Sequence, residues 1–191
     1  MTRLLILDVA GTLVRLGTTE PYPQVADKVA AWRGPVAIVT NQPGPLWRLV
    51  MGRTRYPDLT GVAAYLAEVA TALPVLKGAT WFVSLGHPKL THQLPADTRR
   101  ALAAALSTRL RREGLEVFTS TRVDWHKPHP GMLLAACRHF GVATTDALMV
   151  GDQADDSIAA ARAGVPFRWA NDWRGEQGGV RQWVRRLVAA G

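Results

Sequence analysis

Short runs of consecutive apolar residues alternate along the chain with longer stretches in which apolar residues recur every three or four positions. The runs are typical of strands buried on both faces of a parallel sheet, and the longer stretches are typical of amphipathic helices. The apolar runs are residues 4–7, 36–39, 81–85, 115–118, 147–150 and 165–169. Helices are predicted around Val25, Val29 and Trp32, then over 57–73, 97–112, 130–140 and 157–163, and finally around Val180, Val184 and Leu187.

The regular exchange of strand and helix patterns predicts repeated βαβ units, and so an α/β fold with a Rossmann-like parallel sheet flanked by helices. No internal repeat, low-complexity tract or linker interrupts the pattern, so we expect residues 1–191 to form a single domain. Only 23 residues separate Thr12 from Val36, and one predicted helix uses much of that span. We therefore expect no large cap domain between the first two strands.

Composition narrows the class of protein. With 48% hydrophobic and 20% charged residues, the chain is globular rather than disordered. No apolar run approaches the roughly 20 residues that span a bilayer, so we expect no membrane association. The single cysteine, Cys137, lies on the apolar face of a predicted helix and favours the cytoplasm. The net charge of +8 suggests either an anionic partner or only an arginine-rich composition. The arginines are scattered along the chain, which favours the second explanation.

Polar residues follow several of the predicted strands, where the functional groups of open parallel sheets gather. Singly, each is explained as a helix cap, a turn hydroxyl or a solvated charge. Together they form a set suited to a phosphate group: a carboxylate, a hydroxyl, a lysine and an acidic cluster. The set comprises Asp8, Thr40, Asn41, Lys127, Asp152, Asp155 and Asp156.

This set predicts metal-assisted chemistry on a phosphate ester. Carboxylates can hold Mg²⁺, a hard cation that prefers oxygen ligands. Mg²⁺ and a lysine neutralise the phosphate charge, so that a carboxylate can approach phosphorus. Attack by the carboxylate would give an aspartyl phosphate, which water then cleaves.

The same residues resemble the haloacid dehalogenase (HAD) superfamily. The segment 8–13 is similar to its first motif, Thr40 to its second, Lys127 to its third, and 151–156 to its fourth. The segments 40–44 and 127–133 resemble the branch with histidinol-phosphate phosphatases, heptose bisphosphate phosphatases and the phosphatase domains of polynucleotide kinases.

The resemblance implies a role for each residue. Asp8 would be the nucleophile and a Mg²⁺ ligand, and the carbonyl of Ala10 and Asp152 would be further ligands. Asp156 would support the metal site, directly or through water. Asp155 would either contact the metal ligands from outside or cap a helix. Substrate-binding groups would be Thr40, Asn41 and Lys127.

Ala10 departs from the family pattern. HAD phosphatases usually carry there an aspartate that protonates the leaving oxygen and later activates water, and alanine can do neither. Three explanations stand: an introduced inactivating change, a naturally slow or specialised hydrolase, or a protein that only binds its ligand. Phosphonoacetaldehyde hydrolases resemble this chain in having alanine here, but they need a cap lysine, and Lys28 is the only lysine in the corresponding span.

Without a large cap, the mouth of the site should be open. We expect a phosphorylated small metabolite as the substrate, with a polynucleotide terminal phosphate as the alternative. Three arginines, a histidine and a tryptophan lie near predicted loops and could line the mouth: Arg48, Arg53, Arg55, His126 and Trp125. Trp125 either stacks on a base or, as we prefer, packs against its own loop.

Overall fold

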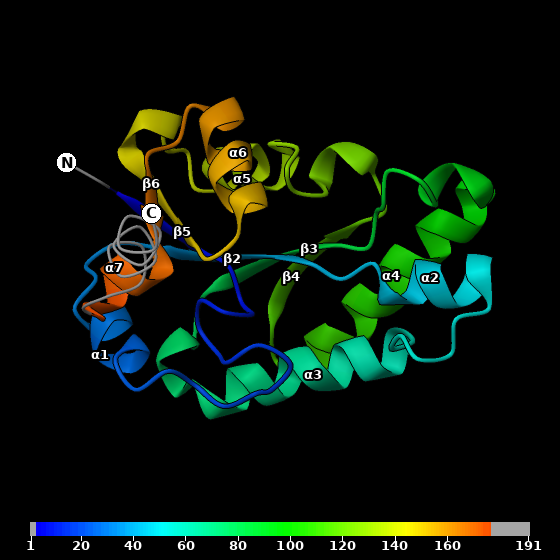
Figure 1. The fold of residues 1–191 in the computed structure, drawn as a ribbon, viewed down its shortest axis with the longest axis horizontal. Coiled ribbons are helices and arrows are strands. Elements are labelled where there is room, and N and C mark those ends of the chain that lie inside the picture. The colour runs from blue at the N-terminus through cyan, green and yellow to red at the C-terminus, as the bar shows by residue number, and fades with distance from the viewer. Residues whose placement is uncertain (1–2, 177–191) are drawn as a thin grey trace, which may run out of the picture.

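The computed structural model describes residues 3–176, and within them six strands form one parallel sheet (Figure 1). The order across the sheet is β4-β3-β2-β1-β5-β6, and every neighbouring pair is parallel. The strands are β1 (Leu4–Leu7), β2 (Val36–Asn41), β3 (Thr80–Ser84), β4 (Glu116–Ser120), β5 (Ala147–Gly151) and β6 (Phe167–Trp169). The predicted parallel α/β fold is thereby confirmed.

Helices cover both faces of the sheet in three layers, with α5 and α6 above it and α1, α3 and α7 below it in Figure 1. The α-helices of the described residues are α1 (Val25–Ala30), α2 (Gly44–Met51), α3 (Leu59–Ala72), α4 (Ala96–Arg112), α5 (Gly131–His139), α6 (Ala154–Ala163) and α7 (Ala170–Arg174). The connection between β1 and β2 holds only α1, so no large cap is inserted there.

Two hydrophobic cores follow from the alternation of side chains along the strands. Leu5 and Leu7 of β1 pack into the core beneath α1, α3, α4 and α7, whereas Leu4 and Ile6 pack into the core beneath α5 and α6. Successive residues of a strand point to opposite faces, so a strand between two helical layers must be apolar throughout. Cys137 is buried in the second core, as its helical position predicts.

Several predicted boundaries differ from those observed. The helix around Val25 ends at Ala30 and leaves out Trp32, whose indole nitrogen instead donates to the carbonyl of Pro35. The second strand runs two residues further than expected, because Thr40 and Asn41 pair with β3. Two helices, α2 and α7, were not predicted, and the expected helix around Val180, Val184 and Leu187 lies outside the described residues.

The start of α6 was also placed too late, at residue 157 instead of Ala154. A capping contact explains the earlier start: the Asp156 carboxylate, at the third helical position, accepts from the Gln153 main-chain N–H at 3.0 Å. Asp155 and Asp156 therefore lie in the first helical turn, where carboxylates are stabilised by the helix dipole.

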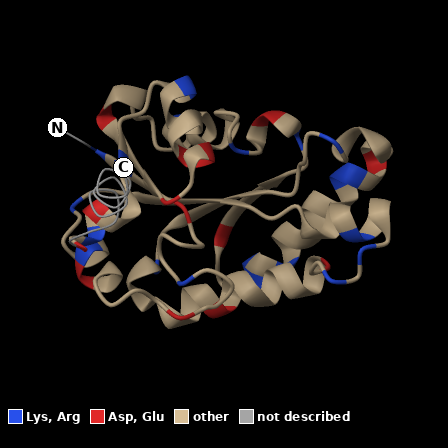
Figure 2. Cartoon of the chain, in the orientation of Figure 1, with Lys and Arg blue, Asp and Glu red and all other residues tan. Residues whose placement is uncertain are grey.

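Basic residues occur on several elements rather than on one face (Figure 2). None of the described helices is long and apolar enough to cross a membrane.

Candidate active site

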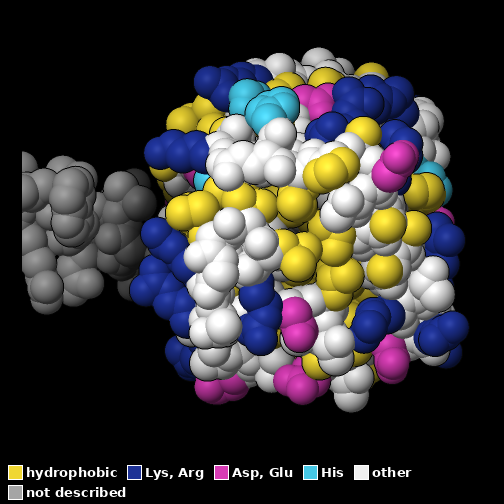
Figure 3. All heavy atoms as spheres, turned by 90° about the vertical axis from the view of Figure 1, so that its right-hand side faces the viewer, with side chains coloured by type: hydrophobic (Ala, Val, Ile, Leu, Met, Phe, Trp, Pro, Cys, Tyr) yellow, Lys and Arg dark blue, Asp and Glu magenta, His cyan; other side chains and the backbone are white. Residues whose placement is uncertain are grey.

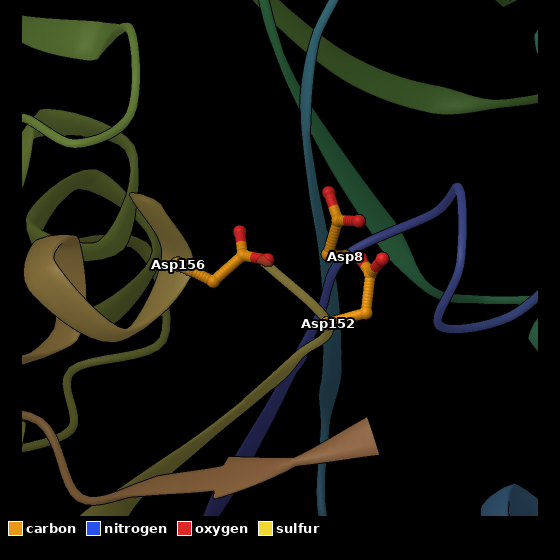
Figure 4. Close-up of side chains that lie close together, drawn as sticks. All are labelled: Asp8, Asp152 and Asp156. Atoms are coloured by element: carbon orange, nitrogen blue, oxygen red, sulfur yellow. The ribbon is translucent and has the colours of Figure 1, made fainter. Parts of the chain in front are cut away.

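Three carboxylates meet at the carboxyl ends of the two central strands. Asp8 directly follows β1, Asp152 directly follows the adjacent β5, and Asp156 extends from the first turn of α6. One oxygen from each lies within 4.8 Å of the others, and Figure 4 shows the three side chains converging. The chain leaves β1 towards β2 and later returns to add β5 on the other side, so this cluster lies where the direction of sheet growth reverses.

Gly11 makes room for the Asp152 carboxylate. Its φ of +80° is in the left-handed region, and a Cβ at this position would overlap the carboxylate of Asp152. The turn after Asp8 is held by its own main chain, in which Gly11 N donates to Val14 O at 2.7 Å. Only glycine combines this backbone conformation with so close an approach.

Lys127 joins two of the carboxylates. Its ammonium donates to Asp8 Oδ1 at 2.5 Å and to Asp156 Oδ1 at 2.6 Å, and it is almost completely buried. The main chain of Lys127 is fixed in turn by Asn41, whose Nδ2 donates to the carbonyl of Lys127 and whose Oδ1 accepts from its N–H, both at 3.1 Å.

The structure corrects the placement of Lys127 at a strand end. The preceding strand, β4, ends at Ser120, and two strands separate it from β1. A lysine at the end of β4 would be about 14 Å from Asp8, since neighbouring strands are about 4.8 Å apart. The loop after β4 therefore has to carry Lys127 back across the sheet, with a short helical turn at Val123–Trp125 on the way.

Burial and charge act against each other at these groups. Burial raises the pKa of Asp8 to about 6; Lys127 opposes this rise and the neighbouring Asp156 adds to it. Burial lowers the pKa of Lys127, but Asp8 and Asp156 outweigh burial and hold it above its ordinary value. The pKa of Asp152 is raised, chiefly by burial. With all four groups ionised the cluster carries a charge of −2, which a divalent cation would balance.

The remaining predicted residues lie around this cluster. Thr40 is buried at the end of β2, and its Oγ1 accepts a hydrogen bond of 3.1 Å from Gln42 Nε2, which leaves the hydroxyl proton free to be donated. Ala10 is half-buried two residues after Asp8 and has no polar side-chain atom. Asp155 is exposed in the first turn of α6, where a capping charge belongs.

Sequence reasoning missed two parts of the site. Arg174 of α7 is buried and donates to the carbonyls of Gly11 and Thr12. Nothing in the local sequence distinguishes it from the other arginines of the chain. Gln153 orients Asp152 by donating from Nε2 to Oδ2 at 2.7 Å. The usual capping signal is Ser, Thr, Asp or Asn followed three residues later by Glu or Gln, and Gln153 with Asp156 does not match it.

A row of rings leads away from Lys127, from the loop before α5 to helix α2 and the loop that follows it. His126 meets His87 at 5.5 Å between ring centroids, His87 meets Trp47 at 4.8 Å, and Trp47 stacks on Tyr56 at 5.6 Å. Burial lowers the pKa of His126 to about 4, so its imidazole is neutral at pH 7. Arg53 lies over Trp47 and Arg55 over Tyr56.

Figure 3 views the side of the molecule on which α2 lies, with arginine and lysine side chains along the margin of a hydrophobic surface.

Trp125 takes no part in the row of rings. It packs instead against the core beneath α5 and α6, with its ring 6.2 Å from that of Phe82. Trp125 therefore packs, as we preferred, but it packs against this core and not against its own loop as predicted.

Part of the sequence is similar to that of known proteins. Residues 110–170 match the family model of haloacid dehalogenase-like hydrolases. Over 47 residues the chain is 57% identical to a phosphoglycolate phosphatase from Nitrosococcus oceani, a match that covers 25% of this chain and 20% of that protein. The chain thus spans well under two thirds of this relative.

A solved structure supports the same fold. It is the D,D-heptose 1,7-bisphosphate phosphatase from B. bronchiseptica, complexed with magnesium and phosphate. The superposition has a TM-score of 0.50 at 20% identity and covers 93% of this chain and 87% of that one. At this identity the likeness concerns the path of the backbone, and the chemistry must be argued from the side chains described above.

Proposed function

We propose that this chain, a haloacid dehalogenase-like hydrolase by its fold and by its segment 110–170, is a Mg²⁺-dependent phosphomonoester hydrolase with Asp8 as the nucleophile. The observation that carries the proposal is the buried lysine between Asp8 and Asp156, with Asp152 beside them. A buried ion pair alone is weak evidence for a function. Here, however, the pair belongs to a cluster with an excess of negative charge at the end of the sheet where ligands bind.

The carboxylate cluster fits a magnesium ion. Oδ1 of Asp152 is buried without a hydrogen-bond partner among the described residues, which is costly unless another positive group approaches it. Asp8, Asp152 and the carbonyl of Ala10 would hold the ion, with Asp156 supporting them. Magnesium would supply positive charge to the phosphoryl oxygens and so lower the barrier to attack by an anion.

The side chains around the cluster would supply the nucleophile and the hydrogen-bond donors to the phosphoryl group. With a pKa of about 6, Asp8 is mostly ionised at pH 7 and can act as a nucleophile. One of its oxygens bonds to phosphorus while the bond to the alcohol oxygen breaks, and the alcohol leaves with that electron pair. Lys127 and the Thr40 hydroxyl would donate to the phosphoryl oxygens. Water then bonds to phosphorus as the bond from phosphorus to Asp8 breaks, which frees inorganic phosphate and restores the Asp8 carboxylate. The proton that the water loses balances the proton that the alkoxide takes up.

Ala10 limits this scheme at the leaving oxygen. An alkoxide is a poor leaving group unless it is protonated, and the methyl group of Ala10 can neither give nor take a proton. We therefore expect slow turnover of ordinary alkyl phosphates and faster turnover of esters whose leaving group needs no proton. A small phosphorylated metabolite is the substrate class that we favour.

Two other functions have some support. A polynucleotide terminal phosphatase is favoured by Arg53 and Arg55, which lie over Trp47 and Tyr56 in the row of rings that leads to Lys127. Binding would then weaken steeply with added salt, and no detectable binding of oligonucleotides at low salt would exclude it. A phosphate-binding protein without turnover is favoured by Ala10 alone.

The deciding experiment is a phosphatase screen of the chain and of its Ala10→Asp variant with Mg²⁺, over phosphorylated metabolites and phosphorylated oligonucleotides. Asp8→Asn in each background is the control, because it removes the nucleophile while keeping the size of the side chain. Hydrolysis that depends on Asp8 supports the proposal. If neither form hydrolyses any ester although both bind Mg²⁺, the binding function is favoured.

A further inference from the structure

We propose that Arg174 is a positioning residue for the metal site, acting through the turn that follows Asp8. The proposal rests on the proposed function, because it concerns the same Mg²⁺ site. Arg174 lies at the end of α7, more than 160 positions along the chain from the turn, and its side chain is 1% exposed. A buried arginine is costly, so its contacts need an explanation.

All five N–H donors of Arg174 have acceptors. Nη1 donates to Gly11 O at 3.0 Å and to Thr12 O at 2.9 Å. Nε and Nη2 donate to the two carboxylate oxygens of Glu176 at 2.7 and 3.1 Å, and Nη2 also donates to Asn171 Oδ1 at 2.5 Å. The guanidinium carbon lies 3.7 Å from the ring centroid of Tyr22. Such a fixed planar fork can hold two carbonyl groups in one orientation.

The two carbonyls belong to the turn on which the proposed metal site depends. Arg174 holds the carbonyl of Gly11, and the carboxylate of Asp152 occupies the space that a Cβ on Gly11 would fill. The amide nitrogen of Gly11 belongs to the same peptide plane as the carbonyl of Ala10, which is a proposed ligand. Arg174 holds the following peptide, through the Gly11 carbonyl, and the two peptides share the Cα of Gly11. Loosening the following peptide would let the Ala10–Gly11 peptide rotate, which would move a ligand atom and change the space left for Asp152.

The effect of Arg174 should be geometric rather than a long-range effect of charge. Its positive charge is already paired with Glu176 through two hydrogen bonds, so the pair contributes little net charge to the cluster. Replacement of the arginine should therefore weaken Mg²⁺ binding by loosening the turn. Loss of a group that orients metal ligands typically costs about 10- to 100-fold in metal affinity.

The test is to titrate Mg²⁺ into the metal-free chain, with tryptophan fluorescence or calorimetry as the readout, well below the unfolding temperature of each variant. Arg174→Leu should weaken Mg²⁺ binding at least about 10-fold. Arg174→Lys should lie between it and the unchanged chain, because an ammonium has only three donors and no planar fork. Arg168→Leu is the matched control, since Arg168 is exposed on β6; it should bind Mg²⁺ like the unchanged chain.

A purely structural role would lower the unfolding temperature of Arg174→Leu and leave its Mg²⁺ affinity unchanged, and that result would overturn the proposal. If Arg174→Leu does not fold, Arg174→Lys and Glu176→Gln carry the test, and unchanged Mg²⁺ affinity in both would also overturn it. If the unchanged chain itself binds no Mg²⁺, the proposed metal site fails and this inference with it. If the unchanged chain and the variants bind Mg²⁺ equally well, the positioning role of Arg174 is rejected but the proposed metal site is kept.

Discussion

The side chain of Asn41 makes two hydrogen bonds to the main chain of Lys127, and so ties the end of β2 to a residue 86 positions further along the chain. Both ends of the Asn41 amide are used in this way. The contact holds the loop that carries the Lys127 ammonium to Asp8 and Asp156. Asn41 can thus serve the site by positioning Lys127, whereas a direct contact of Asn41 with substrate stays a prediction.

Asn41→Ala should destabilise the chain by about 1–3 kcal/mol, because it leaves the N–H and carbonyl of Lys127 without partners in a partly buried loop. It should also weaken the binding of a phosphate mimic such as vanadate, since Lys127 would no longer be held in place. Urea unfolding and a vanadate titration measure the two effects. Normal stability together with normal vanadate affinity would contradict the positioning role.

Lys127→Ala should weaken the binding of phosphate or vanadate by about 10- to 100-fold, because a charged hydrogen bond in a buried site contributes about 1.5–3 kcal/mol. Lys89→Ala is a suitable control, since Lys89 is an exposed lysine on the loop after β3. Calorimetric titration of both variants measures the difference. Equal affinity in the two variants would count against a phosphate site at Lys127.

Gly11→Ala should abolish Mg²⁺ binding, because the new Cβ would overlap the Asp152 carboxylate. Gly17→Ala is a matched control: Gly17 also has a positive φ, of 74°, but a Cβ added there would have no atom within 4 Å. Both changes place alanine in the left-handed region, at a cost of about 1–2 kcal/mol. A Mg²⁺ titration separates them, and equal affinity in the two variants would show that the close approach to Asp152 has no role.

Mg²⁺ affinity should fall as the pH is lowered through about 6. Burial raises the pKa of Asp8 to about 6 and also raises that of Asp152. A protonated carboxyl is a poor ligand, so protons compete with Mg²⁺ below this pH, and one competing proton weakens binding about tenfold per pH unit. Above pH 7 the affinity should level off. Calorimetry in buffers of different ionisation enthalpy would count the protons released; none at pH 5.5 would contradict this account.

Ala10→Asp should raise turnover of an alkyl phosphate by about 10²- to 10⁴-fold, the usual contribution of a positioned general acid or base. Asp8→Asn in that background should abolish turnover. An activated ester with a good leaving group should gain less from Ala10→Asp in the first step, because its leaving oxygen needs no proton. Steady-state rates on the two kinds of ester measure the difference.

Fast hydrolysis of a natural ester by the chain with Ala10 would contradict this role of position 10, and another acid would then be needed. Tyr65 of α3 is the first to test, with Tyr65→Phe. The pKa of its phenol is raised by burial and, to a smaller extent, by the charge of Asp8, so the phenol keeps its proton at neutral pH.

The sequence by itself determined the fold class and most of the candidate site. Continuous apolar runs such as 4–7 have a single stable placement, between two helical layers, since every side chain along them must be buried. The polar residues directly after such strands then had to meet at one edge, because parallel strands end on the same side of a sheet. This is why the sequence could predict that Asp8 and Asp152 lie close together. The prediction is confirmed, because the strands that they follow, β1 and β5, are neighbours in the sheet.

Tertiary structure alone decided the contacts that cross between elements. No local pattern indicates that Asn41 binds the main chain of Lys127, or that Arg174 holds the turn at Gly11 and Thr12. Helices α2 and α7 were missed for a different reason: they are short, at eight and five residues, and so few turns give little repeat to recognise in the sequence. The spacing of apolar residues along the sequence indicates which face of an element is buried. Hydrogen bonds between distant segments depend instead on how all the elements pack together in the folded chain.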